Sequence, residues 1–313
     1  MSGLDLVVLG TASQVPTRTR SHNGYLLRWG PEGLLFDPGE GTQRQFTFAG
    51  VSTARITRIL LTHLHGDHCL GLPGVLQRIA LDGSGEEIPL CFPASGLPWV
   101  ERLCDASIGS RAPVRLVPVA DEGAVVCDGP LRLTAMPLEH RVPVLGWRVE
   151  EPARVHLVPE RLAAAGVVGR DAGRLLADGS VRVGERTVRV DEVGERRPGR
   201  SAAVVMDTRS CDNALRLAEG VDLLLCEATF LESEGDLARE YGHLTAREAA
   251  TIAREAGVGL LVLSHGSLRY PRPDGHLREA AEVFPDVVVA EDLSVVPFPP
   301  VGSRTAGGGP GEV

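Results

Sequence analysis

The sequence predicts an α/β protein, a sandwich of two mixed β-sheets flanked by helices, with a site along one edge of strand ends. Three observations support this prediction. Apolar runs of strand length recur through both halves of the chain. Several of these runs are followed directly by a His or an Asp. Helical stretches lie between runs, as where Thr245 can cap a helix over 246–256.

The composition is that of an ordinary globular chain of 313 residues, with 43% hydrophobic and 23% charged residues. The net charge of −9 argues against a wholly basic nucleic-acid binder but leaves room for a local basic patch. All 32 basic residues are Arg. Any phosphate-binding surface must therefore be built from Arg, whose planar fork pairs with phosphate oxygens. A coding bias explains the same composition equally simply.

The cysteines and the N-terminus indicate a cytoplasmic protein with no membrane partner. Six cysteines occur without any Cys-x-x-Cys pair, so reduced and mostly buried thiols are expected. Cys69 and Cys211 lie beside candidate metal ligands, although neighbouring side chains often point away. The first residues show no basic region ahead of an apolar segment, so no signal peptide is expected. No apolar run approaches the roughly 18 residues of a membrane span.

The predicted elements follow the apolar runs in order. Strands are expected at 4–9, 25–29, 33–36, 56–61, 88–92, 114–119, 131–136, 146–149, 201–206, 221–226 and 259–263, with a last strand pair within 287–297. A helix is expected to open at about residue 70. The stretch from about 150 to 201 has ten Arg against nine Asp or Glu and reads as an insertion. We therefore expect one domain over 1–298, an arm at about 150–201 and a disordered tail at 299–313.

A run of metal-ligand side chains, from Thr62 to His68, follows the apolar run at 56–61. His63 and His65 project to the same side of an extended chain and can hold one ion. Asp67 and His68 come after Gly66 and can face a second ion. Imidazole and carboxylate together suit zinc or a similar divalent ion. A solvated His-rich loop is the alternative, but four ligands packed directly after a strand favour metal binding.

Further candidate ligands recur after later apolar runs. His140, Asp207 and His265 each follow one of them directly. Asp37, at the end of another run, is expected either to orient a ligating His or to cap a helix. Three other histidines lack such partners and are predicted to be ordinary surface residues; they are His22, His156 and His276.

These motifs resemble those of a known family. The His-x-His-x-Asp-His run, with later His, Asp and His at strand ends, resembles the metallo-β-lactamase superfamily. Within it the chain is similar to the ribonuclease Z family, which trims 3′ trailers from precursor tRNA. The similarity runs from about Leu4 to Pro297. It rests on the stretches Leu9–Thr11, Pro16–Asn23, Phe36–Gln43, Thr62–Gly74, Asp207–Arg209, Glu227–Phe230, Gly242–Thr245, Ser264–His265 and Arg269–Tyr270.

The metal motif alone specifies only the superfamily. A second motif is specific to far fewer proteins and favours ribonuclease Z. It consists of Glu227-Ala228-Thr229-Phe230, followed by His243-Leu244-Thr245 and a helix. The resemblance implies a four-layer αββα sandwich with an inserted flexible arm and two zinc ions per subunit. The ligands would be His63, His65 and His140 for one zinc, Asp67, His68 and His265 for the other, and Asp207 between the two.

The resemblance also implies catalytic roles. Asp67 would be the general base as well as a ligand, and His243 would lie near the scissile phosphate, oriented by Glu227. These roles fit the chemistry, because hydrolysis needs an activated water and a proton for the departing 3′ oxygen. The arm would hold precursor tRNA, and a homodimer would present one subunit's arm to its partner's site.

Some features depart from the family pattern or leave alternatives open. The family arm carries a Gly-Pro element and many Lys, whereas Gly169-Arg170 stands here and the arm is nearly neutral. Arg18 and Arg20 are predicted to be exposed and able to hold phosphate. His/Asp sites also accept manganese or iron. Two other functions remain open: a hydrolase of a small phosphodiester, ester or sulfate on the same scaffold, and a non-catalytic RNA-binding module with structural metals.

Overall fold

The computed structural model describes residues 3–83, 85–120, 124–127, 129–300 and 302. The chain divides into two compact units, each described by itself. Unit 1 comprises residues 1–126, 133–149 and 201–313, and unit 2 comprises residues 127–132 and 150–200. Unit 1 holds both large sheets and every candidate site residue named from the sequence.

The first sheet of unit 1 has the strand order β18-β1-β2-β3-β4-β5-β6. Its strands are β1 (Leu4–Gly10), β2 (Gly24–Trp29), β3 (Glu32–Phe36), β4 (Arg58–Leu60), β5 (Ile88–Pro93), β6 (Val114–Val119) and β18 (Val295–Pro297). The strands from β18 to β3 pair antiparallel, and those from β3 to β6 pair parallel. The change follows from the connections, since a short turn at Gly30 joins β2 to β3 and helices join the parallel strands.

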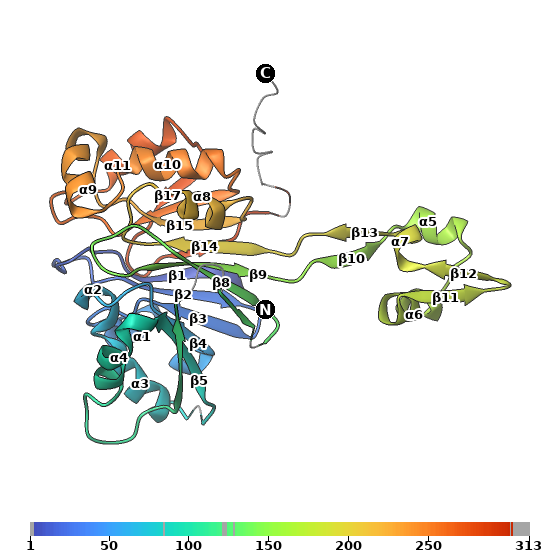
Figure 1. Ribbon diagram of the computed structural model, residues 1–313, viewed down its shortest axis with the longest axis horizontal. Coiled ribbons are helices and arrows are strands. Elements are labelled where there is room, and N and C mark those ends of the chain that lie inside the picture. Colours follow the sequence, from blue (N-terminus) through green and yellow to red (C-terminus); the bar gives the residue numbers. More distant parts are fainter. Residues whose placement is uncertain (1–2, 84, 121–123, 128, 301, 303–313) are drawn as a thin grey trace. The chain divides into compact units, whose positions relative to one another are not determined.

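Helices cover the outer face of this sheet (Figure 1). They are α1 (Thr42–Ala49), α2 (Gly66–Cys69), α3 (Leu72–Leu81) and α4 (Leu97–Cys104), with 3₁₀ turns at Thr53–Arg55 and Ala94–Gly96. Phe46, Leu76 and Val100 of these helices are buried against Ile59 and Leu90 of the sheet. Burial of this apolar face, worth about 25 cal/mol per Å², holds the layer in place.

The second sheet has the strand order β17-β16-β15-β14-β9-β8-β7. Its strands are β7 (Ala124–Cys127), β8 (Arg132–Pro137), β9 (Leu145–Glu150), β14 (Ser201–Val205), β15 (Leu223–Glu227), β16 (Leu260–Ser264) and β17 (Val287–Val289). Strands β14 to β17 pair parallel, so their carboxyl ends meet at one edge. The helices that follow β14, β15 and β16 are α8 (Asp212–Ala218), α9 (Gly235–Tyr241), α10 (Ala246–Glu255) and α11 (Asp274–Ala281), with a 3₁₀ turn at Glu232–Glu234.

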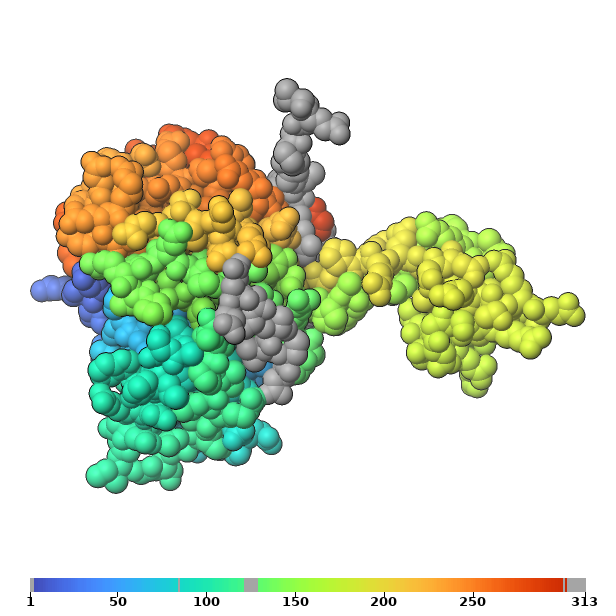
Figure 2. Space-filling view, viewed as in Figure 1, coloured from blue at the N-terminus to red at the C-terminus, as the bar shows by residue number. Residues whose placement is uncertain are grey.

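The two sheets face each other and complete a four-layer sandwich. Trp147 of β9 is fully buried and its indole Nε1 donates to the Leu61 carbonyl at 3.2 Å. The Leu145 amide donates to the Thr62 carbonyl at 2.8 Å. In Figure 1 the helices after β3 and the helices after β14 lie on opposite sides of the paired sheets. Figure 2 shows the same two parts of the sequence, blue-green and orange, at opposite sides of unit 1. The predicted αββα fold of two mixed sheets is confirmed.

Unit 2 is a small α/β body with its own core. It contains β10 (Arg154–Leu157), α5 (Pro159–Ala164), α6 (Arg170–Asp178), β11 (Ser180–Val183), β12 (Arg186–Arg189), α7 (Val190–Val193) and β13 (Gly194–Arg197). β10 pairs with β13 and β11 with β12, both antiparallel. The buried residues of its core are Val167, Leu175, Val188 and Val193. This core explains how a stretch so rich in charge keeps a defined fold.

One predicted feature of unit 1 is wrong. The expected strand pair within 287–297 does not form, because β17 pairs parallel with β16 while β18 pairs antiparallel with β1. The chain between them passes from one sheet to the other. The tail expected at 299–313 lies outside the described residues from 303 onward. In the part of the chain that the structure describes, no helix combines the length and apolar character needed to span a bilayer.

Candidate metal centre and active site

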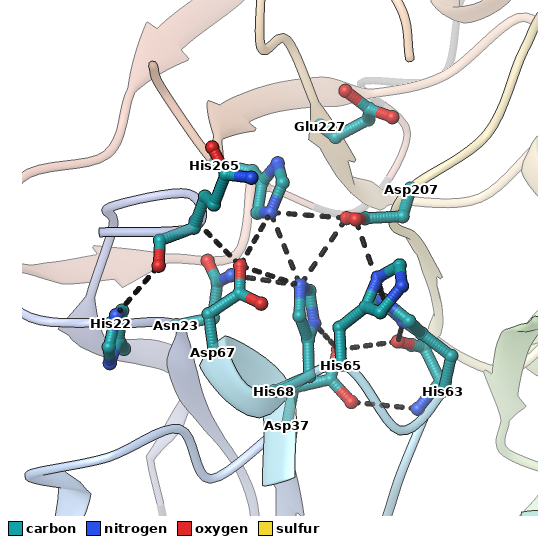
Figure 3. Close-up of polar contacts among 12 residues, drawn as sticks. His22, Asn23, Asp37, His63, His65, Asp67, His68, Asp207, Glu227 and His265 are labelled. Carbon is teal, nitrogen blue, oxygen red and sulfur yellow. Dashed lines mark hydrogen bonds and ion pairs between the residues drawn. The ribbon is translucent and has the colours of Figure 1, made fainter. Parts of the chain in front are cut away.

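The candidate site lies where strands of both sheets end. β4 is followed by His63 and His65, β8 by His140, β14 by Asp207, and β16 by His265, while Glu227 is the last residue of β15. Asp67 and His68 lie on the short helix α2, which begins at Gly66. The sandwich therefore brings together all nine site residues predicted from the sequence. Figure 3 labels all of them except His140 and His243.

Two groups of possible ligand atoms meet at Asp207. One group is formed by His63, His65 and His140 with Asp207, the other by Asp67, His68 and His265, and the atoms within each lie within 4.8 Å of one another. Oδ2 of Asp207 lies 3.5 Å from His63 Nε2 and 3.8 Å from His140 Nε2. Oδ1 lies 3.4 Å from His68 Nε2 and 3.2 Å from His265 Nε2. One carboxylate thus faces each group with a different oxygen.

The donor atoms fit divalent cations. His140 Nε2 and Asp207 Oδ1 are buried without a hydrogen-bond partner, and a buried polar atom left in this state costs free energy. Ring nitrogens also face each other, with His63 Nε2 at 2.9 Å from His65 Nδ1. Burial lowers the pKa of His63, His65 and His140, which favours the neutral imidazole that binds metal. No described cysteine belongs to either group.

The second group is more strongly charged. Burial lowers the pKa of His68, but Asp207, Asp37 and Asp67 raise it well above its usual value. Burial raises the pKa of Asp67, but His68 and His265 lower it to far below its usual range. A cation in this group would take the place of the His68 proton, so metal binding there would release a proton.

Asp37 orients His68 and the turn that carries His63. Its Oδ2 accepts from His68 Nδ1 at 2.8 Å, and its Oδ1 accepts from the Thr62 amide at 2.7 Å. Thr62 Oγ1 also donates to Asp37 and lies 3.0 Å from His63 Nδ1. The alternative capping role is wrong, because helix α1 begins after Gly41. Such partners fix the tautomer and ring direction of a ligating His.

Glu227 joins His243 to the centre. Its Oε1 lies 2.9 Å from His243 Nδ1, and its Oε2 accepts from Thr229 Oγ1 at 2.7 Å. Thr229 Oγ1 is also 2.8 Å from His265 Nδ1. Burial lowers the pKa of His243, but the carboxylates of Glu227 and Asp207 raise it to about 9. His243 is therefore protonated at neutral pH. Thr229 was not singled out from the sequence, although it lies inside the motif that narrowed the family.

Three of these residues have a strained backbone conformation. Asp37, Asp207 and His265 have φ angles of 45°, 46° and 59°, in the left-handed region that is unfavourable for side chains other than Gly. Each lies just after a strand of the paired sheets. Strain of about 1–3 kcal/mol per residue persists only where the surrounding structure imposes it, and such residues gather at functional sites.

His140 is held by a glycine at the end of α9. Its Nδ1 donates to the Gly242 carbonyl at 2.8 Å, which leaves Nε2 facing Asp207. Gly242 has a φ of 78°, and a Cβ at this position would lie only 2.9 Å from His140 Nδ1. Gly is therefore required here both by the turn and by the close approach of the ring.

A loop from β1 supports Asp67 (Figure 3). Gln14 has a left-handed φ of 55°, and its amide donates to Asp67 Oδ2 at 2.7 Å. His22 Nε2 lies 3.2 Å from the Gln14 carbonyl and so holds this backbone turn. His22, predicted to be an ordinary surface residue, instead contributes to the lining of the cavity beside Asp67.

Two other predictions about polar residues are corrected by packing. Arg20 is half-buried, and its guanidinium donates to the carbonyls of Gly266, Ser267 and Tyr270, so it fastens the loop after His265 and is not free for phosphate. His276 is only 4% exposed and packs edge-on against Tyr270. His156 and Arg18 are exposed as predicted.

The candidate centre opens into a cavity of about 510 Å³. Asp67, His140, Asp207, His243 and His265 line it together with other side chains. Arg141, Arg269 and Tyr241, none of them proposed for the site from the sequence, line it as well. The arrangement can bind an anionic substrate beside two cations and deliver a proton from His243.

Comparisons with known proteins agree with this architecture. The family described as "Beta-lactamase superfamily domain" matches residues 33–158. The chain is 55% identical to a ribonuclease Z from Nocardia farcinica over 96% of this chain and 99% of the relative. It is 49% identical to a ribonuclease Z from Thermobifida fusca over 99% and 98% of the two chains.

Solved structures extend the comparison. The short form of human tRNase Z superimposes with a TM-score of 0.66 and 28% identity over 94% of this chain and 99% of that one. YhfI from Bacillus subtilis, a metallo-β-lactamase fold protein, gives a TM-score of 0.69 at 18% identity over 94% and 99% of the two chains, which shows the shared fold. Given the near full-length identity to its relatives, the chain belongs to the ribonuclease Z family of endoribonucleases within the metallo-β-lactamase superfamily.

Proposed function

We propose that the protein removes the 3′ trailer from precursor tRNA by two-metal hydrolysis of a phosphodiester and leaves a 3′-hydroxyl on the tRNA. The observation that carries this proposal is the Asp207 carboxylate, whose two oxygens face two separate ligand groups. Beside it stands His243, protonated at neutral pH through Glu227. The family, with a human member named tRNase Z, supplies the substrate class.

One cation would be held by His63, His65 and His140. The other would be held by Asp67, His68 and His265, and Asp207 would be a ligand of both. Two zinc ions per subunit suit this donor set, and manganese or iron suit it as well. When bound, such ions supply an activated water and neutralise charge on the scissile phosphate.

The proposed base and acid come from different parts of the chain, Asp67 from α2 and His243 from the turn between α9 and α10. Asp67 is ionised, the state that a general base requires, because His68 and His265 favour its charged form. His243 carries a proton that it can donate to the departing 3′ oxygen of the tRNA. Glu227 would keep His243 charged and fix the direction of its ring.

The remaining proposals concern how the substrate is held. We propose a single domain over residues 1–298, in which the insertion at about 150–201 forms an arm that binds precursor tRNA. The separate core of unit 2 and the ten Arg of the insertion support this role. We also propose a cytoplasmic homodimer in which one subunit's arm serves its partner's site, as the family resemblance implies.

The test is cleavage of a precursor tRNA by purified protein, with the new 3′ end mapped to the nucleotide. We expect cleavage after the discriminator base, abolished by a chelator and restored by zinc or manganese. The Asp67→Ala variant should fold, as judged by circular dichroism, and lose turnover. Retained turnover in this variant would exclude the base role.

A small nitrophenyl phosphodiester distinguishes the other functions. Hydrolysis of this ester without any cleavage of precursor tRNA would identify a different hydrolase on the same scaffold. Binding of RNA with no hydrolysis of either substrate, at full metal occupancy, would identify a non-catalytic module.

A further inference from the structure

A second hollow lies next to the metal cavity. It has a volume of about 350 Å³. Its lining residues are Leu64, His65, Pro93, Ser95, Gly96, Trp99, Val142 and Pro143. We call it the Trp99 groove. His65 lines both the groove and the metal cavity, so the two hollows meet at that side chain. A strand leaving the metals past His65 would enter the groove.

Trp99 is unusually exposed for a tryptophan. It is 57% exposed, whereas Trp29 and Trp147 are 4% and 0% exposed. The reason is its place on α4, where Val100 and Cys104 take the buried face. The Arg102 guanidinium lies 4.8 Å from the centroid of the Trp99 ring. Trp is enriched among the residues that contribute most to binding surfaces, and this one lines a hollow beside the candidate cavity.

The surroundings of the groove suit a nucleic-acid strand. Arg141 lines the metal cavity, and the next residues, Val142 and Pro143, line the groove, so a cation stands where the hollows meet. Arg102 supplies a second cation beside the ring. None of the described residues that line the groove is acidic. Aromatic rings beside Arg side chains are the usual platform for single-stranded bases and their phosphates.

The direction of the strand follows from the proposed acid. His243 would protonate the 3′ oxygen that stays with the tRNA, so the tRNA end lies on the His243 side. The His140 ring contacts both His243, at 5.1 Å between centroids, and His65, at 5.2 Å. Among the described ring pairs, His65 contacts His63 and His140 and not His243. The groove is therefore next to His65 and not next to the proposed acid, on the side where the trailer can leave.

Resting on the proposed function, we propose that the Trp99 groove is a subsite for an unpaired trailer nucleotide downstream of the cut. One base stacks on Trp99, and the adjoining phosphates face Arg141 and Arg102. The groove contributes to binding of the trailer and takes no part in the chemical step.

Kinetics of matched variants test the subsite. Trp99→Leu should lower kcat/KM on a precursor with a five-nucleotide trailer by about tenfold, as loss of one stacked base predicts. Trp99→Phe should keep most of the activity, and all variants should hydrolyse a small nitrophenyl phosphodiester like the wild type. Phe48→Leu is the control, because Phe48 is also exposed, at 55%, beneath an Arg guanidinium at 4.7 Å. Equal loss on the small ester would overturn the proposal.

Abasic nucleotides identify the stacked base. Removing the base from one of the first three trailer nucleotides should cost the wild type about tenfold in kcat/KM. The same change should cost Trp99→Leu nothing more. If the loss from the abasic nucleotide and the loss from Trp99→Leu multiply at every position, stacking on Trp99 would be contradicted. Light scattering tests whether the groove is instead a contact between copies of the chain. If Trp99→Leu changes the molecular mass and causes no trailer-dependent loss of kcat/KM, the groove is such a contact and the proposal is overturned.

Fluorescence separates this proposal from the proposed function. Trp29 and Trp147 are buried, so quenching by a 5′-phosphorylated single-stranded RNA reports on Trp99. Quenching without precursor cleavage would refute the proposed function and leave an RNA subsite. Cleavage at the expected junction without quenching by this RNA would refute the subsite alone.

Discussion

At the residue scale, the proposed proton donor depends on a buried carboxylate. Glu227 is fully buried, and it reaches His243 with one oxygen and Thr229 with the other. Thr229 in turn contacts His265. Glu227 therefore sets the charge of His243, the proposed acid, and through Thr229 it sets the direction of His265, a proposed ligand. This double role explains why the motif that begins at Glu227 is specific to one family.

Replacing Glu227 by Gln should move the pH dependence of turnover. His243 with its pKa near 9 stays protonated, and so active as an acid, up to about that pH. Without the Glu227 carboxylate its pKa falls toward that of a free His, about 6.5. The alkaline limb of kcat against pH should shift to lower pH. Glu240→Gln, an exposed change on α9, is the control; an unchanged limb in Glu227→Gln would refute the role of the pair.

Replacing Asp37 by Asn should weaken metal binding and leave the fold intact. The amide keeps the shape but loses the charge that orients His68 through Nδ1. Loss of such a partner costs roughly 10–100-fold in metal affinity. Metal content after dialysis against graded chelator measures the effect, and Asp105→Asn, at an exposed carboxylate, is the control. Wild-type affinity in Asp37→Asn would contradict this role.

At the element scale, helix α10 begins as the sequence predicts. Thr245 accepts from the Glu248 amide, and Glu248 accepts in return from the Thr245 amide at 2.8 Å, a complete capping box. The cap residue lies two positions after His243, and α10 begins at the next residue, Ala246. Ala249, Ala250 and Ala253 of the helix are buried against the second sheet. The cap therefore links the stability of a core helix to the position of the proposed acid.

Thr245→Ala should lower the free energy of unfolding by about 1 kcal/mol, the usual value of an N-cap. Urea denaturation followed by circular dichroism measures it. Thr251→Ala, in the same helix, is the control, because Thr251 Oγ1 only donates to the Arg247 carbonyl one turn back. A loss in Thr245→Ala no larger than in Thr251→Ala would show that the cap contributes little.

At the scale of the whole molecule, the two compact units suggest a division of labour. Unit 1 carries the candidate centre, and unit 2 keeps its own buried core. The Glu151 amide donates to the Arg200 carbonyl at 2.9 Å, so the segment that enters the insertion and the segment that leaves it lie side by side. A short linker can therefore replace the insertion.

Deleting residues 153–198 should raise KM for precursor tRNA far more than it slows a nitrophenyl phosphodiester. The chemistry uses unit 1 alone, whereas the proposed arm binds only the large substrate. Steady-state kinetics on both substrates measures the difference. Leu175→Ala, which removes a buried side chain from the core of unit 2, should give a smaller effect of the same kind. Equal losses on both substrates would contradict the arm role.

The sequence by itself determined the local features. Apolar runs set the strands, Thr245 set the start of a helix, and a ligand at each strand end set the edge of the site. These features depend on short-range physics, namely burial periodicity and backbone preference, which neighbouring residues already specify. The family resemblance followed from the same local motifs.

Only the tertiary structure decided which atoms meet. Asp207 faces His265 with one oxygen because β14 and β16 end at the same edge of the second sheet. It faces His63, which follows β4 of the first sheet, with the other oxygen because the two sheets pack together, as the hydrogen bond from Leu145 to Thr62 shows. His276 is buried and β18 joins the first sheet because packing partners come from distant parts of the chain. Such contacts depend on how whole layers pack, and a local pattern carries no information about a partner two hundred residues away.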